Sequence, residues 1–164
     1  MTFEEYLAAR LPALVRYAVM LTGDPYSAED IVQDAMLRAY RVWRRVQRAD
    51  HPDRYVKRIL TNVYLSWRRG RRLRPAIPYA EAPEVPVGDA TESTALRQEM
   101  WARLGGLAPR QRAAVVLRYY EDLPDAEIAE ILGCAVGTVR SQISRALETL
   151  RRTISLTNGV GHDR

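Results

Sequence analysis

Hydrophobic residues in the first seventy positions recur every three or four residues, which is the spacing of one face of an α-helix. Three such rows follow one another: Phe3, Leu7, Leu11, Leu14, Ala18 and Leu21; then Ala28, Val32, Ala35, Ala39, Val42 and Val46; then Val56, Leu60, Val63 and Trp67. The rows predict one helix over 3–21, or two helices that meet near Pro12. They also predict a helix that starts at Ser27 and another over about 53–69. Residues 23–25, Gly-Asp-Pro, predict a stop and a turn between the first two helices.

The pattern changes completely between residues 75 and 93. This stretch has four prolines (Pro75, Pro78, Pro83 and Pro86), four acids (Glu81, Glu84, Asp89 and Glu92) and no basic residue. Such a composition predicts an extended linker. Helical spacing resumes at about Thr94 and continues to about Ile154. The sequence therefore predicts an all-α fold of two small helical domains, 1–74 and 94–155, joined by a flexible acidic, Pro-rich linker (75–93) and followed by a frayed tail (156–164).

The second domain contains two short helical patterns that meet at Gly133. The first buries Ile128, Ala129, Ile131 and Leu132, and the second buries Val139, Ile143, Ala146, Leu147 and Leu150. Gly133 favours a left-handed helix end, and Thr138 is the predicted cap of the second helix. The pattern predicts a helix-turn-helix whose basic second helix enters a DNA major groove, although an αα-hairpin that binds nothing has the same spacing. The acids around the first helix (Glu121, Asp122, Asp125, Glu127 and Glu130) predict a surface that turns away from DNA.

Charge is distributed unevenly along the 164 residues. The chain has a net charge of +5, but twelve basic and only two acidic residues lie between Arg41 and Arg74. The rest of the chain holds thirteen basic and eighteen acidic residues, so an acidic protein encloses one strongly basic block. Such a block favours a polyanionic partner, most simply nucleic acid, although a solvated helix face has the same composition.

Several classes of function are not supported by the sequence. Cys134 is the only cysteine, so an intramolecular disulfide is impossible and a cysteine-based zinc site is not expected. We find no catalytic set and no phosphate-binding loop, and we expect no enzyme activity, no cofactor and no metal. No apolar run has the length of a membrane span, and the first residues lack a signal-peptide core. We therefore expect a cytoplasmic protein that does not insert into membranes.

Three stretches, taken together, resemble one family. They are SAEDIVQDAMLRAYRVW (Ser27–Trp43), YVKRILTNVYLSWRRGRR (Tyr55–Arg72) and LAPRQRAAVVLRYYEDLPDAEIAEILGCAVGTVRSQISRALETLRR (Leu107–Arg152). In this order they are similar to bacterial RNA polymerase sigma factors of the sigma-70 family, in the SigE-like part of its extracytoplasmic-function (ECF) group. The resemblance implies a sigma-2 domain, a linker and a sigma-4 domain. It also implies a protein that binds core RNA polymerase, directs it to a promoter and helps to open the DNA, without catalysis of its own.

The resemblance implies three binding surfaces. Docking on the clamp helices of core polymerase would use Glu29, Asp30, Gln33, Asp34 and Leu37. Recognition of the −10 promoter element would use Arg54, Tyr55, Lys57, Arg58, Thr61, Asn62, Arg68 and Arg69. Recognition of the −35 element would use Thr138, Arg140, Ser141, Gln142 and Arg145.

Some of these residues have a second interpretation. Glu29 and Asp30 also suit the positive end of any helix dipole. Aromatic side chains of the third helix either stack on unpaired bases or pack in the core, and core packing is favoured for Trp67. For Arg110, Arg112 and Arg118 the sequence leaves open phosphate contacts and ordinary surface positions.

The implied partners are core RNA polymerase and promoter DNA, with an anti-sigma factor as a further candidate because such factors are common in the family. No obligate homo-oligomer is expected. The linker acids suggest a further hypothesis, that they mimic nucleic acid in a basic channel of polymerase, but a plain spacer has the same composition. A stand-alone LuxR-like regulator is the main alternative, and it leaves the basic block unexplained. A helical adaptor that binds only proteins leaves both basic surfaces unexplained.

Overall fold

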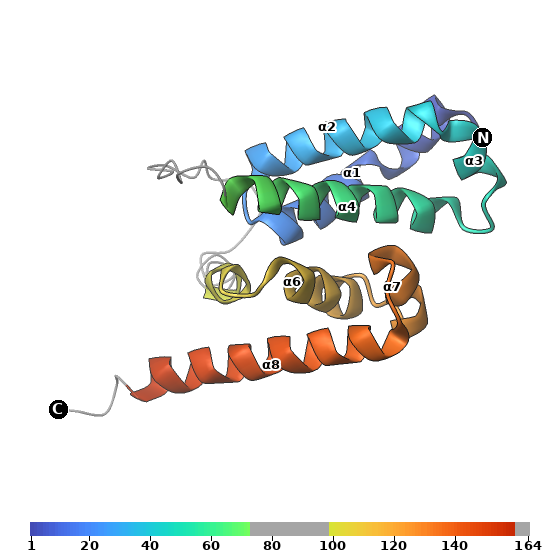
Figure 1. Cartoon of the computed structure of the whole chain (residues 1–164). Helices are drawn as coiled ribbons and strands as arrows, with labels where there is room; N and C mark the ends of the chain where they lie inside the picture. Colours follow the sequence, from blue (N-terminus) through green and yellow to red (C-terminus); the bar gives the residue numbers. More distant parts are fainter. Residues whose placement is uncertain (73–98, 160–164) are drawn as a thin grey trace.

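The computed structural model describes residues 1–72 and 99–159, and all regular structure in these ranges is helical. The first module consists of α1 (Phe3–Thr22), α2 (Pro25–Arg41), the short α3 (Trp43–Arg48) and α4 (Pro52–Arg72). Helices α1, α2 and α4 pack against one another, as Figure 1 shows. The predicted all-α class is confirmed. The predicted linker, with the hypothesis on its acids, lies outside the described residues.

Helix ends in the first module follow local chemistry. Gly23 ends α1 in the left-handed conformation (φ 73°), as its position in the sequence predicts. The predicted start of the second helix at Ser27 is wrong, because α2 begins at Pro25. Asp24 caps it instead: its carboxylate accepts hydrogen bonds from the backbone N–H groups of Tyr26 and Ser27. The apolar row predicted a single helix as far as Val46. The structure divides it at Val42, between the end of α2 and the start of α3.

The second module begins with a helical segment over 99–105, which is followed by α6 (Pro109–Val115) and a π-helical segment, η1 (Val116–Tyr120). Then α7 (Asp125–Leu132) and α8 (Val136–Gly159) form the predicted helix-turn-helix, with Gly133 at φ 65° between them. The predicted cap at Thr138 is wrong, because α8 already begins at Val136. None of the helices within 1–72 and 99–159 has the length and apolarity that crossing a bilayer requires.

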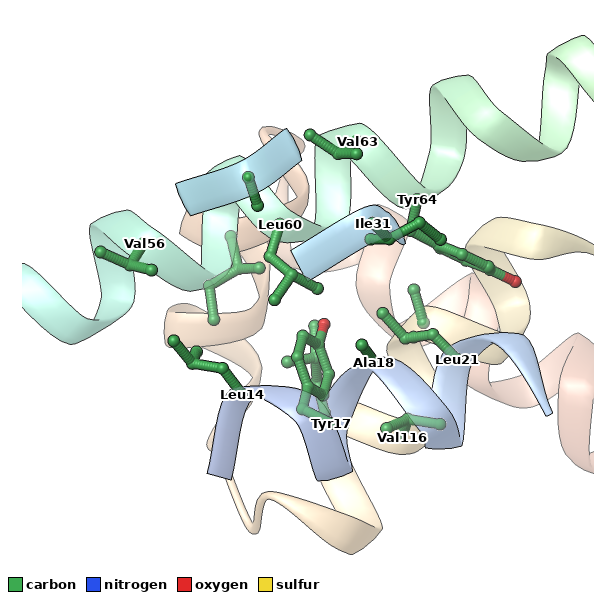
Figure 2. Packing of buried hydrophobic residues seen from close by; sticks show 14 of the residues in the cluster. Leu14, Tyr17, Ala18, Leu21, Ile31, Val56, Leu60, Val63, Tyr64 and Val116 are labelled. Carbon is green, nitrogen blue, oxygen red and sulfur yellow. The ribbon is translucent and has the colours of Figure 1, made fainter. Parts of the chain in front are cut away.

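The two modules share one hydrophobic core. A single cluster of buried side chains includes Tyr17 and Leu60 of the first module together with Leu117, Ile128 and Ile131 of the second. Figure 2 places Val116 of η1 close to Ala18 and Leu21 of α1. Helices α6 and α7 contact α4 on one side and α8 on the other, so they form a layer between these two long helices (Figure 1). The sequence predicted two tethered modules, and it did not predict this packing.

Candidate protein and nucleic-acid interfaces

The outward face of α2 combines apolar and acidic side chains. Tyr26, Leu37 and Tyr40 are 55%, 60% and 60% exposed, although they are large hydrophobic residues. At about 100° per residue they share one face with Asp30 and Gln33, while the buried residues of α2 lie on the opposite face. An exposed apolar stripe with a polar border is typical of a protein-docking surface.

All five predicted polymerase-binding residues lie on or beside this face. Glu29, Asp30, Gln33 and Leu37 are exposed, and Asp34 is half-exposed at the edge, where its carboxylate pairs with Arg38 at 3.2 Å. Sequence reasoning missed Tyr26 and Tyr40. Their spacing from Gln33 and Leu37 was the available signal, but exposed tyrosines are easily assigned to the core.

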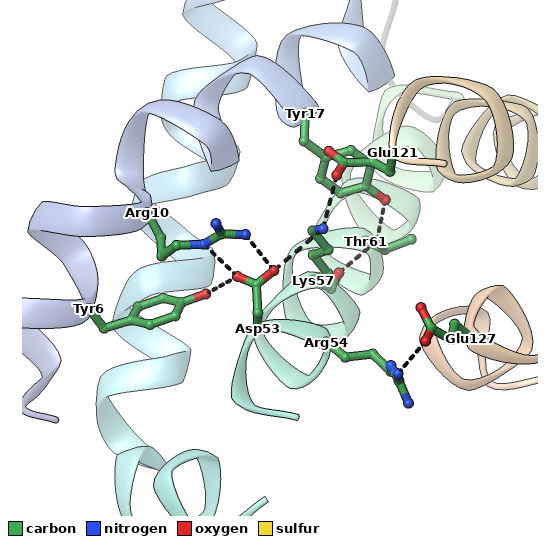
Figure 3. A network of polar contacts seen from close by, with 9 residues as sticks. All are labelled: Tyr6, Arg10, Tyr17, Asp53, Arg54, Lys57, Thr61, Glu121 and Glu127. Carbon is green, nitrogen blue, oxygen red and sulfur yellow. Dashed lines mark hydrogen bonds and ion pairs between the residues drawn. The ribbon is translucent and has the colours of Figure 1, made fainter. Parts of the chain in front are cut away.

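The start of α4 is tied to α1 through Asp53. Its carboxylate accepts hydrogen bonds from the Tyr6 hydroxyl (2.8 Å) and from two nitrogens of Arg10 (3.0 and 2.6 Å), and it also pairs with Lys57 at 3.4 Å (Figure 3). Burial raises the pKa of Asp53, but the hydrogen bonds from Arg10 and Tyr6 and the charge of Lys57 outweigh it, so that its pKa lies below the usual value. Asp53 is therefore ionised at neutral pH and fixes the register of α4.

Thr61 does not fit its predicted contact with DNA. Its side chain is fully buried, and its hydroxyl donates to the carbonyl oxygen of Lys57 at 2.7 Å. The Tyr17 hydroxyl, also fully buried, therefore donates to Thr61 Oγ1 at 2.7 Å (Figure 3). Tyr64 is also buried in the core, so its ring cannot stack on a base in this arrangement. The ring of Tyr55 is only half-buried and remains a candidate for stacking.

The other predicted DNA-binding residues of α4 remain accessible. Arg58, Asn62 and Arg69 are exposed, and Arg68 is half-buried. A cleft of about 340 Å³ opens at the start of α4; its lining is Ala49, Asp50, His51, Arg54, Tyr55, Arg58 and Glu130. Cations beside a tyrosine ring suit a nucleotide, whose phosphate needs charge and whose base can stack. His51 belongs to this cleft and was missed, because a lone histidine in a loop carries no pattern.

Two of the predicted DNA-binding cations are held by acids of the second module. Arg54 donates to the carboxylates of Glu127 and Glu130 at 2.7 and 2.6 Å. Lys57 pairs with Glu121 at 2.9 Å, and its side chain is only 11% exposed. The sequence predicted that these acids belong to a surface turned away from DNA, and the structure shows that they face α4.

A buried arginine also joins the modules. Arg112 of α6 is 4% exposed, and its Nε donates to the carbonyl oxygen of Met20 at 3.0 Å. This carbonyl belongs to the last turn of α1, where a cation is favourable. Arg112 fits neither alternative that the sequence left open, because its side chain is buried and donates to a backbone carbonyl. Burial lowers the pKa of its guanidinium. Gly23 leaves room for it, since a Cβ there would lie 3.2 Å from the Arg112 guanidinium.

The recognition helix α8 carries a row of polar residues beside its buried face. Thr138, Ser141, Gln142 and Arg145 share one face at about 100° per residue, and all but the half-buried Gln142 are exposed. Arg140 lies apart from this row, and its Nε contacts the carboxylate of Asp125 at 3.4 Å. Four of the five predicted residues are thus brought together, and the fifth, Arg140, forms an ion pair with Asp125 at the start of α7.

Metal binding finds no support in the described part of the chain. No group of three or more His, Cys, Asp or Glu within it is placed to hold an ion.

Comparison with known proteins identifies both modules. Residues 7–74 match the family described as Sigma-70 region 2, and residues 97–150 match Sigma-70, region 4. The RNA polymerase sigma-E factor of Streptomyces coelicolor is 40% identical over 152 residues, which cover 93% of this chain and 85% of that protein. The ECF RNA polymerase sigma factor SigE of Mycolicibacterium smegmatis is 33% identical, covering 92% of this chain and 60% of that one. Among solved structures, the sigma factor RpoE of Bartonella quintana in complex with the anti-sigma factor NepR has a TM-score of 0.74 at 27% identity, covering 93% of this chain and 96% of RpoE.

Proposed function

The chain belongs to the sigma-70 family of RNA polymerase sigma factors, in its extracytoplasmic-function group, and on that premise we propose how its modules divide the work of promoter-specific initiation. As a sigma factor it binds core RNA polymerase and promoter DNA. The proposed boundaries are residues 1–74 for the sigma-2 module, 75–93 for the linker and 94–155 for the sigma-4 module.

Core polymerase docks on the outward face of α2. The proposal rests on the exposure of Leu37 and Tyr40 beside the carboxylates of Glu29 and Asp30. The apolar side chains supply most of the binding energy, and the acids orient the docking partner through attraction to its basic residues.

The −10 element is bound by α4 and the cleft at its start. Arg54, Lys57, Arg58, Arg68 and Arg69 hold phosphates, Asn62 reads a base edge, and Tyr55 stacks on an unpaired base. We leave Thr61 out of this set because it is fully buried and hydrogen-bonded to Tyr17.

The −35 element is read by α8. The row of Thr138, Ser141, Gln142 and Arg145 on one face of α8 supports this assignment, because side chains on one face can reach base edges together in a major groove. Arg140 then acts as a flanking phosphate contact, or keeps its place against Asp125.

The same proposal covers partners and location. An anti-sigma factor is a candidate partner, a choice supported by the likeness to RpoE, which was crystallised with NepR. Sigma factors act in initiation without catalysis of their own, and we propose the same here. Since bacterial RNA polymerase works in the cytoplasm, this chain acts there too.

The test is run-off transcription with purified bacterial core polymerase on a library of promoter-length DNA. Transcripts that start at defined sites only when the protein is added support the proposal and reveal both promoter elements. Arg145→Ala should then lose sequence preference at the −35 element alone, and Asn62→Ala at the −10 element alone. Arg16→Ala, at an exposed position of α1 outside the proposed surfaces, is the charge-matched control for Arg145→Ala. If the protein alone binds duplex DNA tightly and does not stimulate polymerase, the LuxR-like alternative is correct instead.

A further inference from the structure

The two tyrosines on the outward face of α2 have different surroundings. Tyr26 is 55% exposed, and no aromatic ring within residues 1–72 and 99–159 stacks against it. Tyr40 is 60% exposed, yet the ring of Phe3, in the first turn of α1, meets it edge-on with the centroids 5.2 Å apart and the planes at 68°. We propose that Phe3 is a positioning residue for polymerase docking, which holds the Tyr40 ring in place before the partner arrives. This inference rests on the proposed docking of core polymerase on α2.

The ring of Phe3 is itself held by other helices. It also meets Trp43 of α3 edge-on, with the centroids 5.4 Å apart and the planes at 81°. Trp43 in turn packs against the ring of Tyr6, with the centroids 5.3 Å apart. Tyr6 is buried, and its hydroxyl donates to the carboxylate of Asp53 at 2.8 Å (Figure 3). The Tyr40 ring therefore leans on a side chain that α3 and α4 keep in position.

The backbone of the first turn of α1 is fixed as well. The hydroxyl oxygen of Thr2 accepts from the N–H of Glu5 at 3.1 Å, and the Glu5 carboxylate accepts from the N–H of Thr2 at 3.2 Å, which together form a capping box. The side chain of Gln47 donates to the carbonyl oxygen of Met1. The start of the chain thus lies beside α3 and the end of α2, as Figure 1 shows. Phe3 is presented by a turn that is bonded on both sides.

The benefit of the contact between Phe3 and Tyr40 arises on binding. A tyrosine that stays 60% exposed has removed only a minor part of its surface from water, so its burial contributes little to folding. An unrestrained side chain on a docking face, by contrast, must be immobilised by the partner, which lowers the affinity by about two- to tenfold. Phe3 restrains the Tyr40 ring in the free chain. The partner then meets a preorganised anchor.

Tyr40 and the acids lie at opposite ends of the docking face. Glu29 and Asp30 precede Tyr40 by eleven and ten residues along α2, which is roughly 16 Å at 1.5 Å per residue. The polymerase surface that fits this face therefore presents basic side chains near the start of α2 and an apolar contact near its end. A fixed ring at one end and charges at the other define the direction in which the partner lies along α2.

Ring mobility in the free chain tests the positioning itself, without polymerase. Tyrosine rings are labelled with carbon-13, the signals of Tyr26 and Tyr40 are assigned from the Tyr26→Phe and Tyr40→Phe variants, and order parameters of the ring axes are measured by NMR relaxation. We expect an ordered ring for Tyr40 and a mobile one for Tyr26. Phe3→Leu should lower the order parameter of Tyr40 to that of Tyr26. Phe3→Tyr keeps an aromatic ring and should leave it unchanged.

Binding of the full chain, labelled at its C-terminus, to purified core polymerase tests the consequence for docking. Phe3→Leu should raise the Kd at least threefold, and Phe3→Tyr should restore it to within twofold of the unchanged chain. In a Tyr40→Ala background Phe3→Leu should have no further effect, because it acts through that ring. Val15→Ala, at a half-buried position of α1 that packs in the core, controls for general destabilisation and should leave the Kd unchanged.

The possible failures are distinguishable. The proposal is overturned if the Tyr40 ring of the unchanged chain is as mobile as that of Tyr26, or if Phe3→Leu leaves the Kd within twofold. It is also overturned if Phe3→Leu weakens binding equally with and without Tyr40, which is what a purely structural role of Phe3 predicts. If neither Tyr40→Ala nor Leu37→Arg weakens binding, the proposed docking face itself is wrong, and the positioning role falls with it.

Discussion

Replacing Thr61 by valine distinguishes a buried structural role from a contact with DNA. Valine has nearly the same shape, so no cavity forms, but the hydroxyl that accepts the hydrogen bond of Tyr17 is lost. The Tyr17 hydroxyl is fully buried and would be left without that partner. Such a group costs about 1–3 kcal/mol, whereas a typical intact hydrogen bond contributes about 1 kcal/mol. We therefore expect Thr61→Val to lower the free energy of unfolding by about 2 kcal/mol and Tyr17→Phe by about 1 kcal/mol.

The double variant provides the sharper number. With both hydroxyls gone, no polar group of the pair is stranded, so the double variant should cost about as much as Tyr17→Phe alone. The coupling energy of the cycle is then about 2 kcal/mol. Urea unfolding followed by circular dichroism measures it: with a slope of about 2 kcal/mol per molar urea, Thr61→Val should lower the midpoint by about 1 M.

Two results would refute this reasoning. Additive costs in the double variant would mean that the two hydroxyls do not interact. A fully folded Thr61→Val protein that initiates transcription poorly because it has lost −10 preference would mean that Thr61 reads DNA after all. Asn62→Ala, one position along α4 and exposed, is the matched variant that should lose −10 preference without loss of stability.

Three further predictions use other parts of the molecule. Leu37→Arg should weaken core-polymerase binding at least tenfold in biolayer interferometry. It should not lower Tm, because the Leu37 side chain is 60% exposed. Met100→Arg, at a position that is 43% exposed, is the control and should leave binding unchanged. The pKa of Asp53 is lowered in the folded state, so its contribution to stability is present above its unfolded-state pKa of about 3.9 and is lost as pH falls through the lower folded value. Asp53→Asn should therefore make the unfolding free energy less dependent on pH below about pH 4. An unchanged pH dependence would contradict the hydrogen-bond network. Gly133→Ala should lower stability by about 1 kcal/mol or more in calorimetry because of its left-handed backbone (φ 65°), while Gly137→Ala, within α8, should be neutral or stabilising.

Apolar spacing and the turn at Gly133 were predicted from the sequence, whereas two helix starts and the long-range partners were not. Gly133 and the apolar spacing on both sides of it identified the helix-turn-helix because turn and packing are encoded within a few residues. The start of α2 was misplaced because Ser27 and Asp24 are both good caps, and only the geometry shows which one acts. Periodicity tells which face of a helix is apolar, but it does not tell what covers that face.

The same limit explains the misassigned residues of α4. This helix is covered on one side by α1 and α2 and on another by α6 and α7, so its buried surface is wider than the single row from Val56 to Trp67. Thr61 falls within the widened surface. Arg54 and Glu127 lie 73 positions apart, and no pattern in the sequence connects them. Arg112 was placed at a surface because buried arginines are rare.

The covered cations of α4 bear on where a free chain resides in the cell. A chromosome offers millions of non-specific sites, and a segment with twelve basic and two acidic residues between positions 41 and 74 is attracted to all of them. At physiological salt each phosphate contact contributes roughly fivefold in affinity, so withholding two cations weakens adsorption to random DNA by about twenty-five-fold. The face of α2 that we propose as the polymerase-docking surface meanwhile stays exposed. The ion pairs of Arg54 and Lys57 with the second module should thus lower the share of unassembled chains that are bound to random DNA.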